Sequence, residues 1–201
     1  MINLKKRKLT GGALLEVGCG YGFLLEAAKK YFGFRIGTEY SKSAVVQARK
    51  KADQVYEGGI EQIPSNDKFD CIILTHVIEH VYHPKEFLLQ LSGHLKDGGK
   101  MVIATPNMGS CWRYLMGHRW PSFKIPEHIL YFDYYSLSVL MQQAGLKNID
   151  TLPYPHAFPL SLIAAKLKIG MRLFGNRFNL WLPATTVAMY GFYQSNRHHD
   201  V

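Results

Sequence analysis

Two kinds of hydrophobic pattern alternate along the first two thirds of the chain. Short runs that are apolar throughout are typical of strands buried on both faces of a parallel sheet, and stretches with helical spacing separate them. This alternation predicts an open α/β sheet with helices between its strands. Seven segments are predicted strands: Ala13 to Val17, Phe34 to Thr38, Gln54 to Tyr56, Phe69 to Thr75, Lys100 to Thr105, Lys147 to Leu152 and Thr185 to Gln194.

The helices are predicted from apolar residues that recur every three or four positions. Ser41 is a favourable N-cap, and Pro84 is tolerated in a first turn, so both indicate helix starts. Leu95 belongs to the apolar face of the second of these helices, which is predicted to end at Gly98 and Gly99. The predicted helices cover Tyr21 to Phe32, the stretch after Ser41, the stretch from Pro84, Ser136 to Ala144 and Leu160 to Phe174.

Two regions interrupt the regular pattern. Residues 106–133 show little periodicity but many aromatic side chains, and a connection this long is typical of a lid over a site. Residues 156–183 form a basic amphipathic segment before the last strand, inside a longer stretch without any Asp or Glu. This segment either packs on its own sheet or makes a peripheral contact with an anionic membrane surface.

Composition favours one domain over residues 1–201, since a chain of this length with 47% hydrophobic residues can bury one sizeable core. The three cysteines form no CxxC pair, and no signal-peptide pattern follows the basic start, which predicts a cytoplasmic protein with reduced thiols. The net charge of +9 indicates either an anionic partner or a solvated basic face.

The most informative motif is LLEVGCGYG at residues 14–22, which ends the first predicted strand. The dinucleotide fingerprint requires glycines at positions one, three and six, whereas here Gly18, Gly20 and Gly22 occupy positions one, three and five. Glu16 lies two residues before the loop, where a carboxylate repels a pyrophosphate and attracts an ammonium or sulfonium group. The motif therefore favours S-adenosylmethionine over a dinucleotide.

A second carboxylate, Glu39, follows about 20 residues after the loop at the end of the second predicted strand. A carboxylate there can accept hydrogen bonds from both ribose hydroxyls of a nucleoside. NAD-binding folds use the same device, so Glu39 alone leaves an NAD-dependent oxidoreductase open.

Several motifs together resemble the class I S-adenosylmethionine-dependent methyltransferases, from about Ala13 to Leu152. They are EVGCGYG, GTEYS, GGIEQIP, FDCIILTHVIEHVYHP, PEHILYF and QQAGL. The closest resemblance is to ubiquinone-biosynthesis O-methyltransferases and to bacterial sugar and natural-product methyltransferases. It implies a Rossmann-like open sheet of seven mostly parallel strands with an antiparallel last strand, and helices on both faces.

The resemblance also implies roles for individual residues. The glycine loop contacts the methionine moiety, Glu39 holds the ribose, and Thr75 and His76 line the cofactor beside the transferred methyl group. Residues 59–61 frame the adenine. The predicted cofactor-binding residues are Glu16, Gly18, Cys19, Gly20, Tyr21, Gly22, Glu39, Tyr40, Gly59, Ile60, Glu61, Thr75 and His76.

The segment HVIEH, residues 76–80, matches a zinc-peptidase pattern, but it directly follows a buried strand rather than lying on a helix. In the ubiquinone-type relatives the corresponding segment resembles ExxEH and is associated with a divalent metal; here His76 replaces the first acid, and no metal ligand is predicted. A neutral histidine can take a hydroxyl proton near neutral pH. His80 and His128 are the candidate bases, and the alternative for each is a hydrogen bond that only fixes the backbone.

The predicted activity is methyl transfer to a hydroxyl of a small acceptor: a sugar, a quinone or a secondary metabolite. A nucleic-acid substrate is not expected, because THVIEH differs from the Asn or Asp with Pro-Pro-Tyr pattern of base amino-methylation. The alternative is a non-catalytic cofactor-binding module. About a dozen residues precede Ala13, where family members carry a covering helical segment, so either the chain is a fragment or the aromatic loop covers the site.

Overall fold

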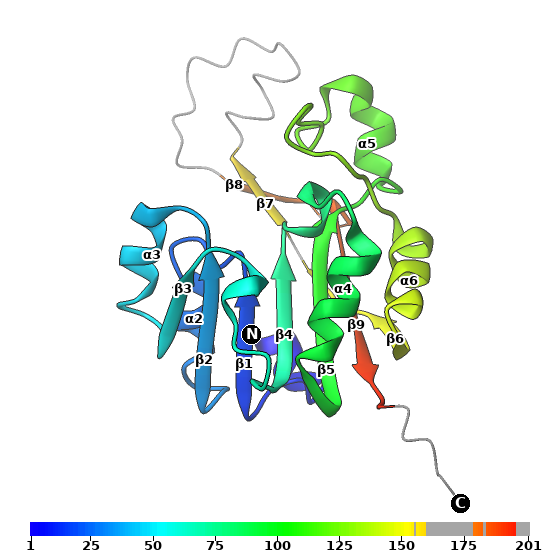
Figure 1. Cartoon of the computed structure of the whole chain (residues 1–201). Helices are drawn as coiled ribbons and strands as arrows, with labels where there is room; N and C mark the ends of the chain where they lie inside the picture. Colours follow the sequence, from blue (N-terminus) through cyan, green and yellow to red (C-terminus); the bar gives the residue numbers. More distant parts are fainter. Residues whose placement is uncertain (155, 160–178, 183, 196–201) are drawn as a thin grey trace, which may run out of the picture.

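The computed structural model describes residues 1–154, 156–159, 179–182 and 184–195. Seven strands form one sheet in the order β3-β2-β1-β4-β5-β9-β6, and two more strands pair separately (Figure 1). The sheet strands are β1 (Ala13–Val17), β2 (Phe34–Glu39), β3 (Gln54–Glu57), β4 (Phe69–Thr75), β5 (Leu95–Pro106), β6 (Leu146–Thr151) and β9 (Thr186–Tyr193).

The strand directions confirm the predicted Rossmann-like sheet. Strands β3, β2, β1, β4 and β5 run parallel to one another, and β9 lies antiparallel to both β5 and β6. The chain moves outward from β1 to β3 and then returns to β4 on the other side of β1. The order therefore reverses between β1 and β4, and ligands of open α/β sheets bind at the carboxyl ends of such strands.

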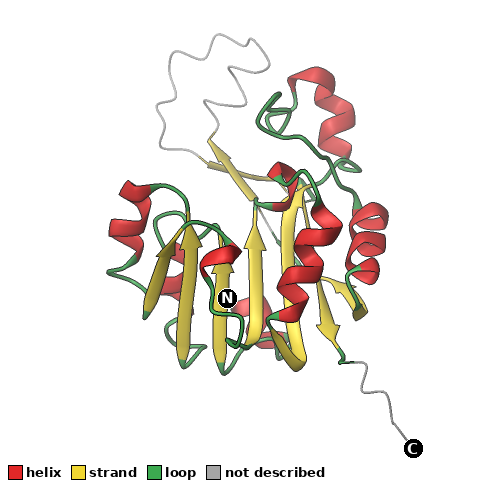
Figure 2. Cartoon of the chain, in the orientation of Figure 1, coloured by secondary structure: helices red, strands yellow, loops and turns green. Residues whose placement is uncertain are grey.

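Helices cover both faces of the sheet (Figure 2). Side chains of β1 alternate between two cores, with Leu15 and Val17 in one and Leu14 in the other. The first core contains buried residues of α4 (Pro84–Gly93) and α6 (Tyr134–Gln143). The second core contains residues of three shorter helices: α1 (Ile2–Lys6), α2 (Phe23–Ala28) and α3 (Lys42–Ala48).

Three predicted helices had wrong boundaries. Helix α2 spans only Phe23–Ala28, and it begins after Gly22, which forms its N-cap in the left-handed conformation. Leu95 belongs to β5, where it pairs with Phe69, since the preceding helix ends at Gly93. Helix α6 begins at Tyr134, because Asp133 accepts a hydrogen bond from the Ser136 amide at 2.8 Å and forms a capping box.

The region 106–133 is partly helical and partly built into the core. It contains α5 (Cys111–Met116) and the 3-10 turn η3 (Gly117–Arg119). Trp120 is only 1% exposed, whereas Tyr114 is 70% exposed. The amide of Met108 donates to the Phe132 carbonyl at 2.7 Å, which draws the two ends of the region together. The predicted lid function of this region stays a prediction.

The segment 156–183 contains a hairpin that the hydrophobic pattern did not predict. Strand β7 (His156–Pro159) pairs antiparallel with β8 (Asn179–Leu182). The predicted basic helix Leu160 to Phe174 lies outside the described residues, so membrane contact stays a prediction. Within the described ranges, every helix is too short or too polar to cross a bilayer.

Candidate active site at the carboxyl end of the sheet

A cavity of about 540 Å³ opens at the carboxyl ends of β1, β2 and β4, beside the reversal in strand order. Seven predicted cofactor-binding residues and the candidate base His80 line it. Its lining consists of Val17, Gly18, Thr38, Glu39, Tyr40, Gly58, Gly59, Ile60, Glu61, His76, Val77, His80, Val81, Tyr82, Phe87 and Gln90.

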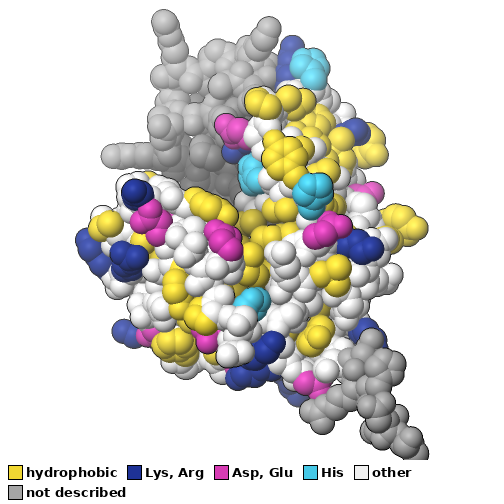
Figure 3. Space-filling model, in the orientation of Figure 1, with side chains coloured by type: hydrophobic (Ala, Val, Ile, Leu, Met, Phe, Trp, Pro, Cys, Tyr) yellow, Lys and Arg dark blue, Asp and Glu magenta, His cyan; other side chains and the backbone are white. Residues whose placement is uncertain are grey.

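The charge of this cavity is acidic. Glu39 and Glu61 contribute carboxylates, and none of the lining residues in the described part of the chain is Lys or Arg. The space-filling view shows Lys and Arg side chains mostly around the periphery of the visible face, with acidic and histidine side chains nearer its middle and upper part (Figure 3). A pyrophosphate would meet like charge here, whereas a ligand that carries a cation would not.

Glycine occurs at the three loop positions for different structural reasons. All three adopt positive φ angles: 68° at Gly18, 52° at Gly20 and 74° at Gly22. A Cβ atom at Gly18 would lie 2.7 Å from Val77 Cγ2, and one at Gly22 would lie 2.9 Å from Ala48 Cα. At Gly20 a Cβ atom would meet nothing within 4 Å. Close packing therefore requires glycine at the two outer positions, and open space adjoins the middle one.

Gly20→Val is expected to weaken S-adenosylhomocysteine binding at least about 100-fold, because the added methyl groups would occupy that open space. Left-handed backbone also costs a side-chain-bearing residue roughly 1–2 kcal/mol. Gly98→Val is the matched control: Gly98 has a φ of 73° and open surroundings but lies in β5, whereas the Gly20 amide donates to Glu39 in the cavity lining. Calorimetry should show normal binding by the control. An equal loss of affinity in both variants would show that backbone strain causes the effect.

Glu39 connects the glycine loop to the end of β2. Its Oε2 accepts a hydrogen bond from the Gly20 amide at 2.9 Å, and its Oε1 accepts one from the Ser41 amide at 2.8 Å. Each carboxylate oxygen has a second lone pair that can accept from a ligand hydroxyl. Glu39 therefore both orders the loop and presents acceptors to the cavity.

The opposite end of the cavity is formed by the turn after β3. Glu61 Oε1 accepts from the Gly59 amide at 2.8 Å and from the Tyr40 hydroxyl at 3.5 Å. A Cβ atom at Gly59 would collide with the Tyr40 hydroxyl oxygen and with Glu61 Oε2. A side chain at Gly59 would displace the ends of Tyr40 and Glu61, so the shape of this end depends on the glycine.

Two predicted cofactor residues, Glu16 and Cys19, are buried and are not among the described residues that line this cavity. Glu16 is 5% exposed and adjoins the core on the helix α2 side of the sheet. Burial raises its pKa to about 8, the Leu25 amide partly opposes this by hydrogen bonding, and the negative charge of Glu39 adds to it. Cys19 is also buried, and burial raises the pKa of its thiol to about 12. The thiol is therefore unreactive.

The raised pKa of Glu16 corrects the prediction that this residue is a carboxylate that attracts a cation and repels a pyrophosphate. At neutral pH the carboxyl of the protein alone is mostly protonated, because its pKa lies near 8. It attracts a cation only when that cation is close enough to favour the ionised form. Glu16 Oε2 and Thr38 Oγ1 are buried and have no hydrogen-bond partner among the described residues. Both atoms can therefore accept or donate to a bound molecule.

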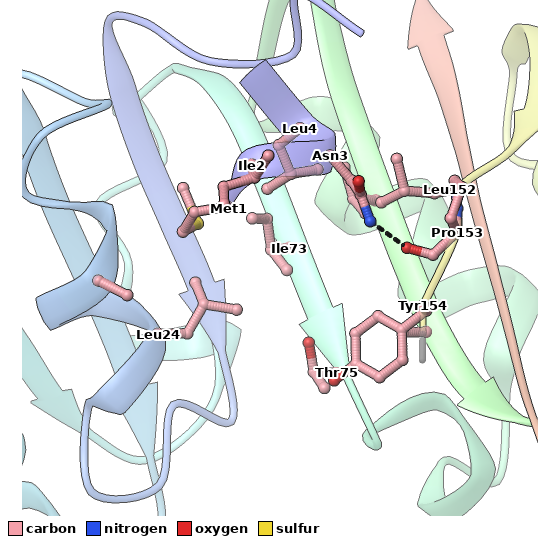
Figure 4. A pocket seen from close by; sticks show the side chains of 13 residues that line it. Met1, Ile2, Asn3, Leu4, Leu24, Ile73, Thr75, Leu152, Pro153 and Tyr154 are labelled. Carbon is pink, nitrogen blue, oxygen red and sulfur yellow. Dashed lines mark hydrogen bonds between the residues drawn. The ribbon is translucent and has the colours of Figure 1, made fainter. Parts of the chain in front are cut away.

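A second cavity of about 450 Å³ lies on the opposite face of the end of β4 (Figure 4). Its walls are mostly apolar and include Ile73, Thr75 and Tyr154 together with residues 1–4. Asn3 Nδ2 donates to the Pro153 carbonyl at 2.6 Å and joins α1 to the segment after β6. Thr75 and His76 are adjacent in sequence but border different cavities.

The two candidate bases are brought together from distant parts of the sequence. The rings of His80 and His128 lie edge to face with centroids 4.9 Å apart. His80 Nδ1 donates to the Glu127 carbonyl at 2.7 Å, because a carbonyl oxygen can only accept. His128 is 7% exposed, and burial is the main reason that its pKa is lowered. Tyr21, predicted at the loop, is 52% exposed and lies beside Phe23.

Glu79 is the residue of this cluster to which the sequence patterns assigned no role. It is 1% exposed in the 3-10 turn η2 (Ile78–His80), and its oxygens bond to His76 Nδ1 and Thr105 Oγ1. Donor atoms of Glu79, His80 and His128 lie within 4.8 Å of one another. Both carboxylate oxygens of Glu79 already have partners, and we assign no metal to these residues. The signal that the sequence offered for Glu79 was an acid three residues after a histidine, His76.

Comparison with known proteins decides the family of this fold and site. The family model described as a methyltransferase domain matches residues 3–151. The chain belongs to the class I methyltransferase family. Solved structures of similar fold include a possible histamine N-methyltransferase from Thermotoga maritima, described as SAM-dependent. It has a TM-score of 0.67 and 21% identity, with 96% of this chain and 87% of that chain covered.

The chain is also similar to curated enzymes. It is 26% identical over 167 residues to the ubiquinone biosynthesis O-methyltransferase of Bradyrhizobium diazoefficiens, which covers 72% of this chain and 65% of the relative. The mitochondrial enzyme of the same name from Schizosaccharomyces pombe is 29% identical over 132 residues, covering 60% of this chain and 45% of the relative. The chain thus spans less than two thirds of the length of these relatives.

A structure determined with bound S-adenosylhomocysteine has the same fold. The magnesium protoporphyrin IX methyltransferase of Synechocystis PCC 6803 superposes with a TM-score of 0.62 at 10% identity, covering 95% of this chain and 78% of that chain. The family match supports S-adenosylmethionine as the cofactor, and the likeness to this structure shows the shared fold.

Proposed function

We propose that this protein transfers a methyl group from S-adenosylmethionine to a hydroxyl of a small acceptor. The observation that carries the proposal is the acidic cavity at the switch in strand order, with Glu39 and Glu61 in its lining. The cavity volume of about 540 Å³ is sufficient for a nucleoside, and a cationic sulfonium is compatible with its charge, whereas a dinucleotide pyrophosphate is not.

The residues present fit this cofactor. Glu39 would accept from the ribose hydroxyls, residues 59–61 would enclose the adenine, and Glu16 would face the methionine ammonium. The buried, unpartnered Glu16 Oε2 and Thr38 Oγ1 are the atoms of the described structure that a polar ligand would satisfy. When bound, S-adenosylmethionine supplies a methyl group on a positively charged sulfur.

For the acceptor we propose a phenolic hydroxyl of a quinol-type ring, with a sugar hydroxyl as the alternative. The names of the curated relatives support a hydroxyl acceptor. Aromatic side chains of residues 106–133 provide flat apolar surfaces that suit either ring. The contribution of the protein is to align the acceptor oxygen with the methyl carbon and to exclude water.

The proposal is tested by titrating the protein with S-adenosylhomocysteine and NADH in a calorimeter. We expect S-adenosylhomocysteine to bind with a dissociation constant on the order of micromolar and NADH to give no heat of binding. Transfer of radiolabelled methyl from S-adenosylmethionine to catechol and to methyl glucoside then compares the two acceptor classes. Binding of NADH alone would refute the proposal, and cofactor binding without transfer to either probe would favour a non-catalytic binding module.

A further inference from the structure

His76 is held in a strained backbone conformation at the edge of the cavity. It follows the last residue of β4 with a φ of 55°, a region that side-chain-bearing residues occupy at a cost of about 1–3 kcal/mol. Its amide donates to the Ala104 carbonyl at 2.8 Å, which fixes this conformation against β5. Strain of this kind concentrates at functional sites because the surrounding structure must maintain it.

The His76 ring is oriented by a buried carboxylate. Glu79 Oε1 lies 3.1 Å from His76 Nδ1, and Glu79 Oε2 accepts from Thr105 Oγ1 at 2.9 Å. Burial by itself would raise the pKa of Glu79, but hydrogen bonds from His76, from backbone and from Thr105 outweigh it and lower the pKa. An ionised carboxylate only accepts, so Nδ1 carries the ring hydrogen and Nε2 carries the lone pair.

We propose that His76 is the general base of methyl transfer and that Glu79 and Thr105 are positioning residues. This inference rests on the proposed function. The acceptor hydroxyl gives its proton to His76 Nε2 while its oxygen forms a bond to the methyl carbon. The bond from that carbon to the cofactor sulfur breaks, and its electron pair remains on the sulfur. The Glu79 carboxylate then stabilises the positive charge of the imidazolium.

His76 suits this role better than the two histidines named from the sequence. It lines the cavity from the end of β4, and its ring nitrogen is paired with a carboxylate, which stabilises a protonated ring. His80 is exposed, and its Nδ1 is paired only with a backbone carbonyl that ties it to residues 106–133. His128 is buried, and its pKa is lowered, mainly by burial.

Several titratable groups around His76 influence the pH dependence of such a base. An ionised carboxylate favours the protonated ring, and a protonated neighbouring histidine disfavours it. The groups are Glu79 and His80 on its own segment, His128 on the facing segment, and Glu39, Tyr40, Glu61 and Tyr82 around the cavity.

The first test uses nitrogen NMR of the full chain labelled at histidine, with the His76 signal identified by its loss in His76→Gln. We expect His76 to carry its hydrogen on Nδ1 in the unmodified protein, and Glu79→Gln to abolish that preference because a neutral amide no longer requires a donor. His83→Gln, a change of an exposed histidine outside the cavity, is expected to leave the His76 signal unchanged. A hydrogen on Nε2 in the unmodified protein would overturn the proposal.

The second test measures methyl transfer to catechol and S-adenosylhomocysteine affinity in the same variants. We expect His76→Gln to lower kcat about 10²- to 10⁴-fold, the range for loss of a general base, while affinity changes less than tenfold. Glu79→Gln should lower kcat and move the acid limb of the pH–rate profile to lower pH, because the protonated ring loses its carboxylate partner, and His83→Gln should change neither. Full turnover by His76→Gln would overturn the proposal. Failure of the unmodified protein to bind S-adenosylhomocysteine would instead refute the proposed function.

Discussion

Glu39→Ala is expected to abolish S-adenosylhomocysteine binding, with a loss of affinity above about 100-fold. The substitution removes the proposed ribose acceptor, and it also leaves the Gly20 and Ser41 amides without the carboxylate that now accepts from them at 2.9 and 2.8 Å. Each such charge-assisted hydrogen bond contributes roughly 1.5–3 kcal/mol. Isothermal calorimetry at constant pH and salt measures the effect directly.

A neighbouring acid provides the control for this experiment. Glu57 pairs with Glu39 across the β2–β3 register, is exposed, and lies outside the lining of the cavity. Glu57→Ala removes the same charge from the same edge of the sheet and should leave the affinity within about twofold. Glu39→Gln should give an intermediate loss, since one amide oxygen still accepts. Normal binding by Glu39→Ala would contradict the assignment of this cavity as the cofactor site.

Glu16→Gln is expected to remove most of the pH dependence of stability between pH 5 and pH 8.5. The pKa of Glu16 is about 8 in the folded protein against an ordinary value of 4.5, so the folded state retains a proton that the unfolded state has lost. The stabilising contribution is complete below pH 4.5 and is lost as the pH rises through about 8. The total change is on the order of 5 kcal/mol at about 1.4 kcal/mol per pH unit.

Urea unfolding at pH 5, 7 and 8.5 measures this contribution. The unmodified protein should lose free energy of unfolding as the pH rises, whereas Glu16→Gln should stay nearly level and become the more stable protein at pH 8.5. Glu26→Gln is the control, because Glu26 carries a side chain that is 60% exposed in α2. Parallel slopes for Glu16→Gln and the unmodified protein would show that Glu16 does not retain its proton in the fold.

The same ionisation should couple to cofactor binding. An ammonium group beside Glu16 favours the carboxylate, so binding at pH 7 should release up to one proton. Calorimetry in two buffers with different heats of ionisation would detect it as a difference in apparent enthalpy. Glu16→Gln should show no such difference. A difference in enthalpy would show that Glu16 is ionised when the cofactor is bound, as the prediction from the glycine motif requires.

The local hydrophobic pattern was sufficient to predict most strands of the sheet. Strands β1 and β4 were predicted residue for residue, because each is a nearly continuous apolar run with clear boundaries. Leu95 was misplaced because an apolar residue at helical spacing looks the same in either element, and only the pairing with Phe69 puts it in a strand. The hairpin of β7 and β8 joins segments about 20 residues apart, which periodicity does not relate.

The sequence by itself determined the strand and helix alternation, the position of the glycine loop and the acid at Glu39, because each depends on residues close together in the chain. Tertiary structure decided the chemistry of the cluster: Thr105 bonds to Glu79 across 26 positions, and His128 reaches His80 from a separate segment. It also decided the ionisation of Glu16, since burial depends on what the fold places around a side chain. Hydrophobic period is a local property, whereas proximity and desolvation arise only when distant segments pack together.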